Sequence, residues 1–188
     1  MRLPFNSLID ALPETCTVND REYPVNTDFR NVLAFIRLQN GDERKEVKNN
    51  YGFSLFFGDV VHRDDIEGLG EWLKYFLSRG EEDREDNGKA PVFDILIDSG
   101  RVYAAFMQIY GINLRRVKIH WWIFKELLDG LPGGTKLADV VEIRQRPFDK
   151  YMRPSEKNEL QRQKDYYRIG KKVDAMDLMF SMMRSIAK

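Results

Sequence analysis

The chain has 188 residues, of which 43% are hydrophobic and 32% are charged, as is typical of one globular domain or of one domain with an appendage. The 30 Lys and Arg residues balance the 30 Asp and Glu residues, so the formal net charge is zero. A neutral chain argues against broad electrostatic binding to nucleic acid, which needs a cationic surface, and leaves room only for a local basic patch.

Cysteine content and hydropathy indicate the compartment. Cys16 is the single cysteine, so no disulfide can form within the chain, which fits a reducing cytoplasm. No apolar run approaches the ~20 residues that a membrane span needs. Prolines and acidic residues interrupt the N-terminal MRLPFNSLIDALPE, unlike a secretory signal. We therefore expect a soluble cytoplasmic protein without a membrane partner.

The first predicted element is a small β-hairpin. Two short β-prone runs, Thr15–Val18 and Glu22–Val25, flank the turn-forming pair Asn19-Asp20. Pro24 cannot donate to a sheet, so it restricts the second run to an edge position.

Two amphipathic helices are predicted after the hairpin. The first is capped by Asn26 or Thr27 and ends at Asn40-Gly41. The second is capped by Asp64 or Asp65 and ends at Gly80. Between them lies a polar stretch and then an apolar cluster at residues 53–57, which fits a short helix or a strand, with helix favoured. The helical spacing is carried by these residues: Phe29, Val32, Leu33 and Ile36 in the first, and Ile66, Leu69, Trp72, Leu73, Phe76 and Leu77 in the second.

The stretch Val102–Leu131 predicts two helices joined by a tight connection, packed as an antiparallel hairpin. Asp98 or Ser99 caps the first of these helices, and Gly111 ends it. Gly130-Leu131-Pro132 ends the second, and one more helix follows. The predicted stripes are Val102, Ala105, Phe106 and Ile109, then Val117, Trp121, Phe124, Leu128 and Leu131, and finally Leu137, Val140, Val141 and Arg144.

The C-terminal part changes character. A charged helix with few apolar positions begins at Pro154, and residues 173–186 carry methionines at helical spacing. We expect a mainly α protein: a compact helical domain of residues 1–150 with a small N-terminal hairpin, and a C-terminal helical extension of residues 151–188. The acidic, turn-rich residues 80–91 form a predicted loop where the core could divide.

No catalytic or metal site is predicted. His120 and His62 have no Cys or His at ligand spacing, so His120 is interpreted as a structural hydrogen-bonding residue and His62 as a loop residue. Cys16 is interpreted as a half-buried structural thiol. We therefore expect a protein that is not an enzyme and needs no cofactor.

Two features suit partner binding. Adjacent helical residues point about 100° apart, so Trp121 and Trp122 cannot both face one seam. Core packing is the favoured interpretation of the pair, with Trp122 as the alternative contact for a partner. The methionine-rich C-terminus is either a docking helix on the core or an adaptable binding helix. Its candidate binding residues are Met176, Met179, Phe180 and Met183.

Several blocks together resemble one family of small tailed-phage proteins. They are NTDFR at residues 26–30, FMQIYGINL at 106–114, HWWIF at 120–124, GLP at 130–132 and Ile143-Arg144. The resemblance covers about residues 10–150, and Asn113 departs from it where an aspartate is expected. The family occurs in phages and prophages of Gram-positive bacteria, encoded just before the tape-measure protein, and is similar in role to tail assembly chaperones.

The resemblance implies a function. We expect a tail assembly chaperone in the host bacterial cytoplasm that binds the tape-measure protein and tail tube proteins, self-associates, and does not bind nucleic acid. The alternative is a structural virion component, such as a head–tail connector or tail completion protein.

Overall fold

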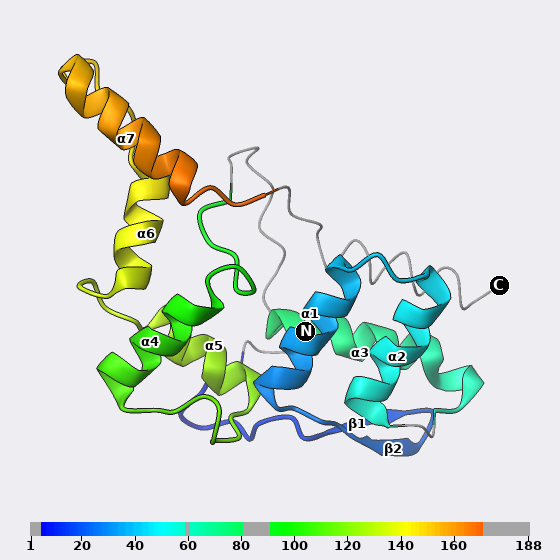
Figure 1. The fold of residues 1–188 in the computed structure, drawn as a ribbon. Coiled ribbons are helices and arrows are strands. Elements are labelled where there is room, and N and C mark those ends of the chain that lie inside the picture. Colours follow the sequence, from blue (N-terminus) through cyan, green and yellow to red (C-terminus); the bar gives the residue numbers. More distant parts are fainter. Residues whose placement is uncertain (1–4, 59–60, 81–90, 171–188) are drawn as a thin grey trace. The chain divides into compact units, whose positions relative to one another are not determined.

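The computed structural model describes residues 5–58, 61–80 and 91–170. Within these ranges the chain forms one two-stranded sheet and seven α-helices (Figure 1). The mainly α class with a small N-terminal hairpin is confirmed. The described part of the predicted C-terminal helical extension is helix α7, Pro154–Tyr166.

The chain divides into two compact units. The first unit holds residues 1–86, 118–126 and 173–188, and the second unit holds residues 87–117 and 127–172. One change of unit lies at residues 86 and 87, inside the predicted loop, although residues 81–90 are outside the described ranges. Residues 127–172 run through the limit predicted at residue 150 without a change of unit.

The predicted hairpin is confirmed. Strands β1 (Thr15–Val18) and β2 (Arg21–Pro24) pair antiparallel, with Cys16 opposite Tyr23. Asn19 and Asp20 form the turn with φ values of 48° and 60°. Positive φ at both central residues matches the twist of a two-residue hairpin, and Asn and Asp tolerate it better than most residues.

Helix α1, Phe29–Asn40, begins where the sequence predicts, but its cap differs. The carboxylate of Asp28 accepts the amide of Arg30 at 2.9 Å, so Asp28 is the cap and not Asn26 or Thr27. The backbone of those two residues is bound elsewhere: the Asn26 amide donates to the Phe56 carbonyl at 2.8 Å, and the Thr27 carbonyl accepts from the Trp121 amide at 2.8 Å.

Helices α2 (Lys45–Phe57) and α3 (Ile66–Ser78), like α1, lie wholly in the first unit. The apolar cluster at 53–57 is helical, as favoured, and α2 also includes polar residues before it. Helix α3 ends at Ser78, and Arg79 and Gly80, which follow it, both have positive φ. The buried faces of α1, α2 and α3 supply most of the core of this unit, which includes Phe29, Val32, Phe35, Phe53, Phe56, Leu69, Leu73 and Phe76.

Asp65 is the N-cap residue of α3, so one of the two predicted positions is confirmed. Its side chain makes no capping hydrogen bond, because its carboxylate turns to the hairpin instead. It accepts from Asn19 Nδ2 at 2.7 Å, from Arg21 Nη1 at 2.8 Å and from the Tyr23 hydroxyl. These bonds, chiefly those from Tyr23 and Arg21, hold the pKa of Asp65 at about 2.

The hairpin can lie close against α3 only because a glycine faces it there. A Cβ added at Gly68 would lie 2.6 Å from Val18 Cγ1, closer than any real contact between carbon atoms. Asp65 and Gly68 therefore fix the hairpin on α3 together, one by hydrogen bonding and one by leaving space.

In the second unit, α4 (Ser99–Tyr110) ends at Gly111 with φ 66°, as predicted. Ile109 is 36% exposed, so its place in the buried stripe was wrong. The predicted helical hairpin over Val102–Leu131 is wrong as well. Residues 111–120 separate α4 from α5 (Trp121–Asp129), and the first six residues of α5 belong to the first unit.

Thr135 caps α6 (Lys136–Gln145) by accepting the Ala138 amide at 3.2 Å, and α6 contacts both α4 and α7. Helix α7 buries only Leu160. None of the helices in the described ranges is both long and apolar enough to cross a membrane.

The Asp65 network predicts acid-sensitive stability. The folded pKa lies below the ordinary value of 3.8. The contribution of Asp65 is therefore complete above about pH 4 and is lost as pH falls towards 2. We expect the urea midpoint to drop over this range, and to drop less in Asp65→Asn, as measured by circular dichroism at pH 2.5–6. Asp64→Asn, at the exposed neighbour, should keep the wild-type slope, and an equal slope in all three proteins would contradict the role of Asp65.

Candidate partner-binding surface

Of the residues predicted to bind a partner, only Trp122 lies in the described part of the chain. Met176, Met179, Phe180 and Met183 fall within residues 171–188, outside the described residues. Trp122 is 1% exposed and Trp121 is 7% exposed, so both are core residues, as the favoured interpretation held. Trp122 therefore presents no exposed ring to a partner in this structure.

Both tryptophans donate hydrogen bonds to the C-terminal end of α3. Trp121 Nε1 donates to the Leu77 carbonyl at 3.1 Å, and Trp122 Nε1 donates to the Phe76 carbonyl at 2.7 Å. The last carbonyls of a helix lack partners within the helix, so adjacent indoles on α5 satisfy two of them. This explains how two neighbouring side chains that point in different directions are both buried in the first unit.

His120 holds the start of α5. Its Nδ1 accepts the Trp122 amide at 3.1 Å, and its Nε2 lies 3.2 Å from the Pro13 carbonyl. Because a carbonyl only accepts, Nε2 carries the proton and the ring is neutral. Burial lowers the pKa of His120 below its ordinary value of 6.5. The structural interpretation of this histidine is confirmed.

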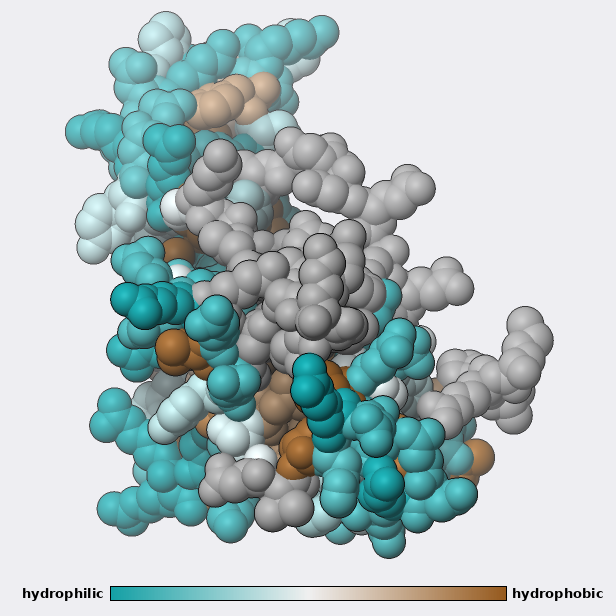
Figure 2. All heavy atoms as spheres, turned by 90° about the vertical axis from the view of Figure 1, so that its right-hand side faces the viewer, coloured by the Kyte–Doolittle hydropathy of each residue, from teal (hydrophilic) through white to brown (hydrophobic). Residues whose placement is uncertain are grey.

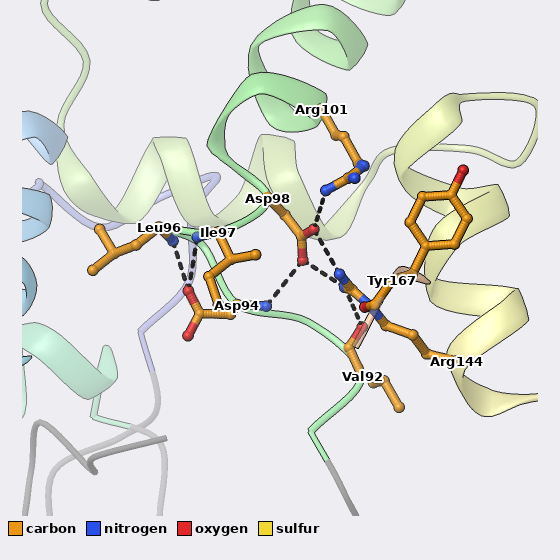
Figure 3. A network of polar contacts seen from close by, with 8 residues as sticks. All are labelled: Val92, Asp94, Leu96, Ile97, Asp98, Arg101, Arg144 and Tyr167. Carbon is orange, nitrogen blue, oxygen red and sulfur yellow. Dashed lines mark hydrogen bonds and ion pairs between the residues drawn. The ribbon is translucent and has the colours of Figure 1, made fainter. Parts of the chain in front are cut away.

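A second network joins the segment before α4 to α6 and to the end of α7 (Figure 3). Arg144 binds Asp98 through both terminal nitrogens, with Nη1–Oδ2 at 2.6 Å and Nη2–Oδ1 at 3.0 Å. The same guanidinium donates to two main-chain carbonyls, those of Val92 at 3.0 Å and Tyr167 at 2.6 Å. We call this set of contacts the Arg144 clasp.

The carboxylate of Asp98 is fully satisfied within the clasp. It also accepts from Arg101 Nη1 at 2.7 Å and from the Asp94 amide at 3.1 Å, while its side chain is 0% exposed. Burial alone would raise the pKa of Asp98, but the hydrogen bonds from Arg144 and from the Asp94 amide hold it below its ordinary value. Like Asp65, Asp98 is the N-cap residue of a helix without a side-chain capping bond, because Arg144, Arg101 and the Asp94 amide occupy its oxygens.

The clasp, with three further contacts, fixes where α7 lies in the second unit. Lys164 Nζ donates to the Arg144 carbonyl at 2.8 Å, so α6 and α7 exchange hydrogen bonds in both directions. The ring of Tyr167 lies within cation–π distance of Arg101 at 5.3 Å and of Lys136 at 5.4 Å. Since α7 buries only Leu160, these mainly polar contacts hold it.

Helix α7 and the segment before it form an exposed surface with large side chains. Tyr151 and Tyr166 are 81% and 80% exposed, and Phe148 is 47% exposed. In Figure 2 the uppermost part of the molecule, which holds α7, is mostly hydrophilic with a small hydrophobic spot. Exposed aromatic rings on a polar background are typical of surfaces that bind proteins.

A groove of about 410 Å³ lies in this surface. Its lining includes Met152 and Leu160, with Arg146, Glu156, Glu159 and Gln163 around them. We call it the α7 groove. The groove was not predicted, because its signal in the sequence is weak. Only the run RPFDKYMR at 146–153, where basic and aromatic residues alternate without helical periodicity, indicates an exposed aromatic segment.

The remaining residues considered for chemistry lie apart. Cys16 is 1% exposed, and burial raises the pKa of its thiol to about 11, so it is the structural thiol that the sequence indicated, although more deeply buried. His62 is exposed beside Asp64. Across the described ranges, no three His, Cys, Asp or Glu side chains come together in a way that could hold a metal ion.

The His120 geometry predicts a pH dependence at mildly acidic pH. The unfolded state takes up the proton first, so the free energy of unfolding falls as pH drops below about 6.5. His120→Asn keeps a capping acceptor and should reduce this slope, whereas His120→Ala should cost about 1 kcal/mol at pH 7.5 through the lost cap. Urea titrations from pH 7.5 to 5.5 measure both effects, with His62→Asn as the exposed control. A slope that His120→Asn leaves unchanged would refute this assignment.

The Arg144 clasp predicts a large stability effect. Arg144→Met leaves the Asp98 carboxylate buried without its main partner, which should cost about 3–5 kcal/mol. Arg144→Lys keeps the charge but loses the bidentate contact with Asp98, and should reduce the free energy of unfolding by less. Arg116→Met, at an exposed position, should change stability by less than about 0.5 kcal/mol. Denaturant unfolding measures the totals, and hydrogen exchange should show the added loss of protection in α7.

Comparison with protein families gives one match. The family model described as bacteriophage Gp15 protein matches residues 8–169, which include both networks and the α7 groove. Comparisons with curated proteins and with solved structures gave no match. Because the matched region spans most of the 188 residues, the chain belongs to the bacteriophage Gp15 protein family.

Proposed function

We propose that the protein is a tail assembly chaperone that binds the tape-measure protein, without catalysis, in the host bacterial cytoplasm. The observation that carries the proposal is membership of a bacteriophage family over residues 8–169. The resemblance of its sequence blocks to tail proteins encoded before the tape-measure protein supports the finer role.

The chemistry of the partner explains why a chaperone is needed. A tape-measure protein is a long helical chain, and its apolar stripes stay exposed until the tail tube forms around it. A chaperone covers such stripes and must then leave as tail tube proteins polymerise. Reversible cover favours many weak contacts, so the chaperone self-associates along the chain and each copy contributes a small surface.

The α7 surface suits such contacts. Tyr151 and Tyr166 offer large rings that order at little entropic cost, and the α7 groove has only two apolar residues in its lining. The C-terminal Met176, Met179, Phe180 and Met183 follow directly in the sequence, and methionine adapts to differing apolar partners. We propose that each of these two segments contributes contacts to the tape-measure helix.

Co-expression with the tape-measure protein tests the proposal. Tape-measure protein should become soluble and co-elute with this chain on a sizing column. Tyr151→Ala/Tyr166→Ala should weaken the complex by about tenfold, as expected for truncated aromatic contacts. A variant with Met176, Met179, Phe180 and Met183 changed to Ser should weaken it further. Tyr51→Ala, which removes a 63% exposed ring on α2, is the matched control and should bind normally.

Mass spectrometry of purified virions separates this role from a structural one. A chaperone leaves during assembly and should be absent from the particle. Stoichiometric amounts in the virion would instead support a head–tail connector or tail completion protein. Failure to solubilise or bind the tape-measure protein would refute the chaperone role.

A further inference from the structure

The segment before the β-hairpin lies on the surface of the first unit. Residues 5–14 form one turn but no helix or strand, and most of their side chains are exposed. Among the described residues, main-chain hydrogen bonds from this segment to the body of the unit begin only at Glu14, whose carbonyl accepts from the Val25 amide at 2.9 Å. Segments with few buried contacts and few backbone hydrogen bonds open more readily than a core. We call residues 5–14 the N-terminal strap.

Side-chain contacts hold the strap near its two ends. At one end the Phe5 ring lies edge-on against the ring of Trp122, with centroids 4.5 Å apart. At the other end His120 Nε2 donates to the Pro13 carbonyl at 3.2 Å. The strap is therefore tethered at Pro13 and closes over Trp122 through Phe5.

Phe5 takes part in the burial of Trp122. The tryptophan is 1% exposed, and its ring also contacts the rings of Tyr75 and Phe76 on α3, with centroids 5.7 Å and 6.2 Å away. Tyr75 and Phe76 are fixed by their helix, whereas Phe5 lies outside regular secondary structure. Opening of the strap therefore uncovers Trp122 and leaves α3 in place.

The surroundings of Trp122 resemble those of a protein-binding site. Glu126 lies one helical turn after Trp122 on α5, and therefore on the same face. Its carboxylate is 3.1 Å from Arg79 Nη2 and accepts from the Ser7 hydroxyl of the strap. Tryptophan, tyrosine and arginine are the residue types that contribute most at protein interfaces. A partner with an apolar side chain and a nearby hydrogen-bond donor can thus replace Phe5 and Ser7.

The strap is itself an incomplete amphipathic helix. Four apolar residues have the spacing of one helical face: Phe5, Leu8, Ile9 and Leu12. A first helical turn forms, because the Asp10 amide donates to the Asn6 carbonyl at 2.9 Å, but Leu8 is 93% exposed and Ile9 is 80% exposed. Full burial of a Leu or Ile side chain stabilises by roughly 1.5–3 kcal/mol, and the closed strap forgoes most of that gain at both positions.

We propose that the N-terminal strap is a releasable cover that keeps Trp122 closed until the partner helix binds. When the strap opens, an apolar side chain of the partner takes the place of Phe5 against Trp122 and Tyr75. The inference rests on the proposed function, since it adds a third contact with the tape-measure helix. Because strap and partner compete for the same ring, the apparent affinity is reduced by the fraction of protein that is closed. The cover also keeps an aromatic surface out of water while no partner is bound.

Electron–electron double resonance on the full chain measures the opening directly. Spin labels at Leu8→Cys and Glu71→Cys, both exposed positions, report the distance from the strap to α3, while buried Cys16 stays unlabelled. The closed strap gives one short distance, and opening adds a longer one. Phe5→Ala should raise the ratio of open to closed strap by about tenfold, because the aromatic contact is lost.

Ile9→Ala is the matched control, at an exposed position of the same strap, and should leave that ratio unchanged. Addition of tape-measure protein should move the wild-type distances towards the open form. A single short distance in the wild type, in Phe5→Ala and in the complex alike would overturn the proposal.

A reversible lock tests whether opening matters for binding. In Ser7→Cys/Glu126→Cys, a short bis-methanethiosulfonate cross-linker holds the strap closed until a reducing agent cleaves it. The locked protein should bind tape-measure protein at least about tenfold more weakly than the same protein after reduction. Each single-cysteine variant, treated in the same way, should bind equally before and after reduction.

The lock also separates this proposal from the proposed function. Equal affinity of the locked and reduced forms would show that the partner does not use the covered site, and would overturn the proposal. If neither the reduced nor the wild-type chain binds tape-measure protein, the chaperone role itself fails. The distances measured in Phe5→Ala then decide by themselves whether the strap opens.

Discussion

The C-terminal end of α3 is the constraint on which the first unit depends. A helix that ends inside a protein leaves carbonyl groups that must find donors, and each buried polar group left unpaired costs on the order of 1–3 kcal/mol. Here the indole of Trp121 donates to the Leu77 carbonyl, and the indole of Trp122 joins the Arg79 amide at the Phe76 carbonyl. His120 then holds those tryptophans by capping α5, and the bridge between Asp28 and His120 ties the start of α5 to the start of α1. The first six residues of α5 thus belong to a unit whose other described elements lie early in the chain.

Much of the local structure could be predicted because its causes are local. Asn19-Asp20 and Gly111 form a turn and a helix end for reasons contained in a few neighbouring residues. The errors arose where a distant partner competed for a side chain. Asp65 has the position of a cap, but three donors from the hairpin bind its carboxylate, and periodicity placed Trp121 and Phe124 in a hairpin with α4 although they pack in the other unit.

The candidate surface was harder to foresee than the core. Helical periodicity of apolar residues identifies buried positions. Tyr151 and Tyr166 are exposed, and the segments that hold them have no such apolar periodicity. Net charge is equally uninformative about the separate units. The chain as a whole has a net charge of zero, but its first unit, with 15 basic and 21 acidic residues, carries −6, and its second unit, with 15 basic and 9 acidic residues, carries +6. An argument from net charge therefore applies to the whole chain and not to either unit.

The Arg144 clasp also bears on how this family can change its sequence. Of the groups that Arg144 binds, only Asp98 contributes a side chain, while Val92 and Tyr167 contribute main-chain carbonyls. Any residue type supplies a carbonyl, so positions 92 and 167 can drift without loss of those bonds. Positions 98 and 144 cannot drift independently, because a lone buried charge is far more costly than a matched pair or an apolar pair. The clasp therefore links the substitutions that positions 98 and 144 can accept, whereas its bonds to the carbonyls of residues 92 and 167 place no demand on the side chains there.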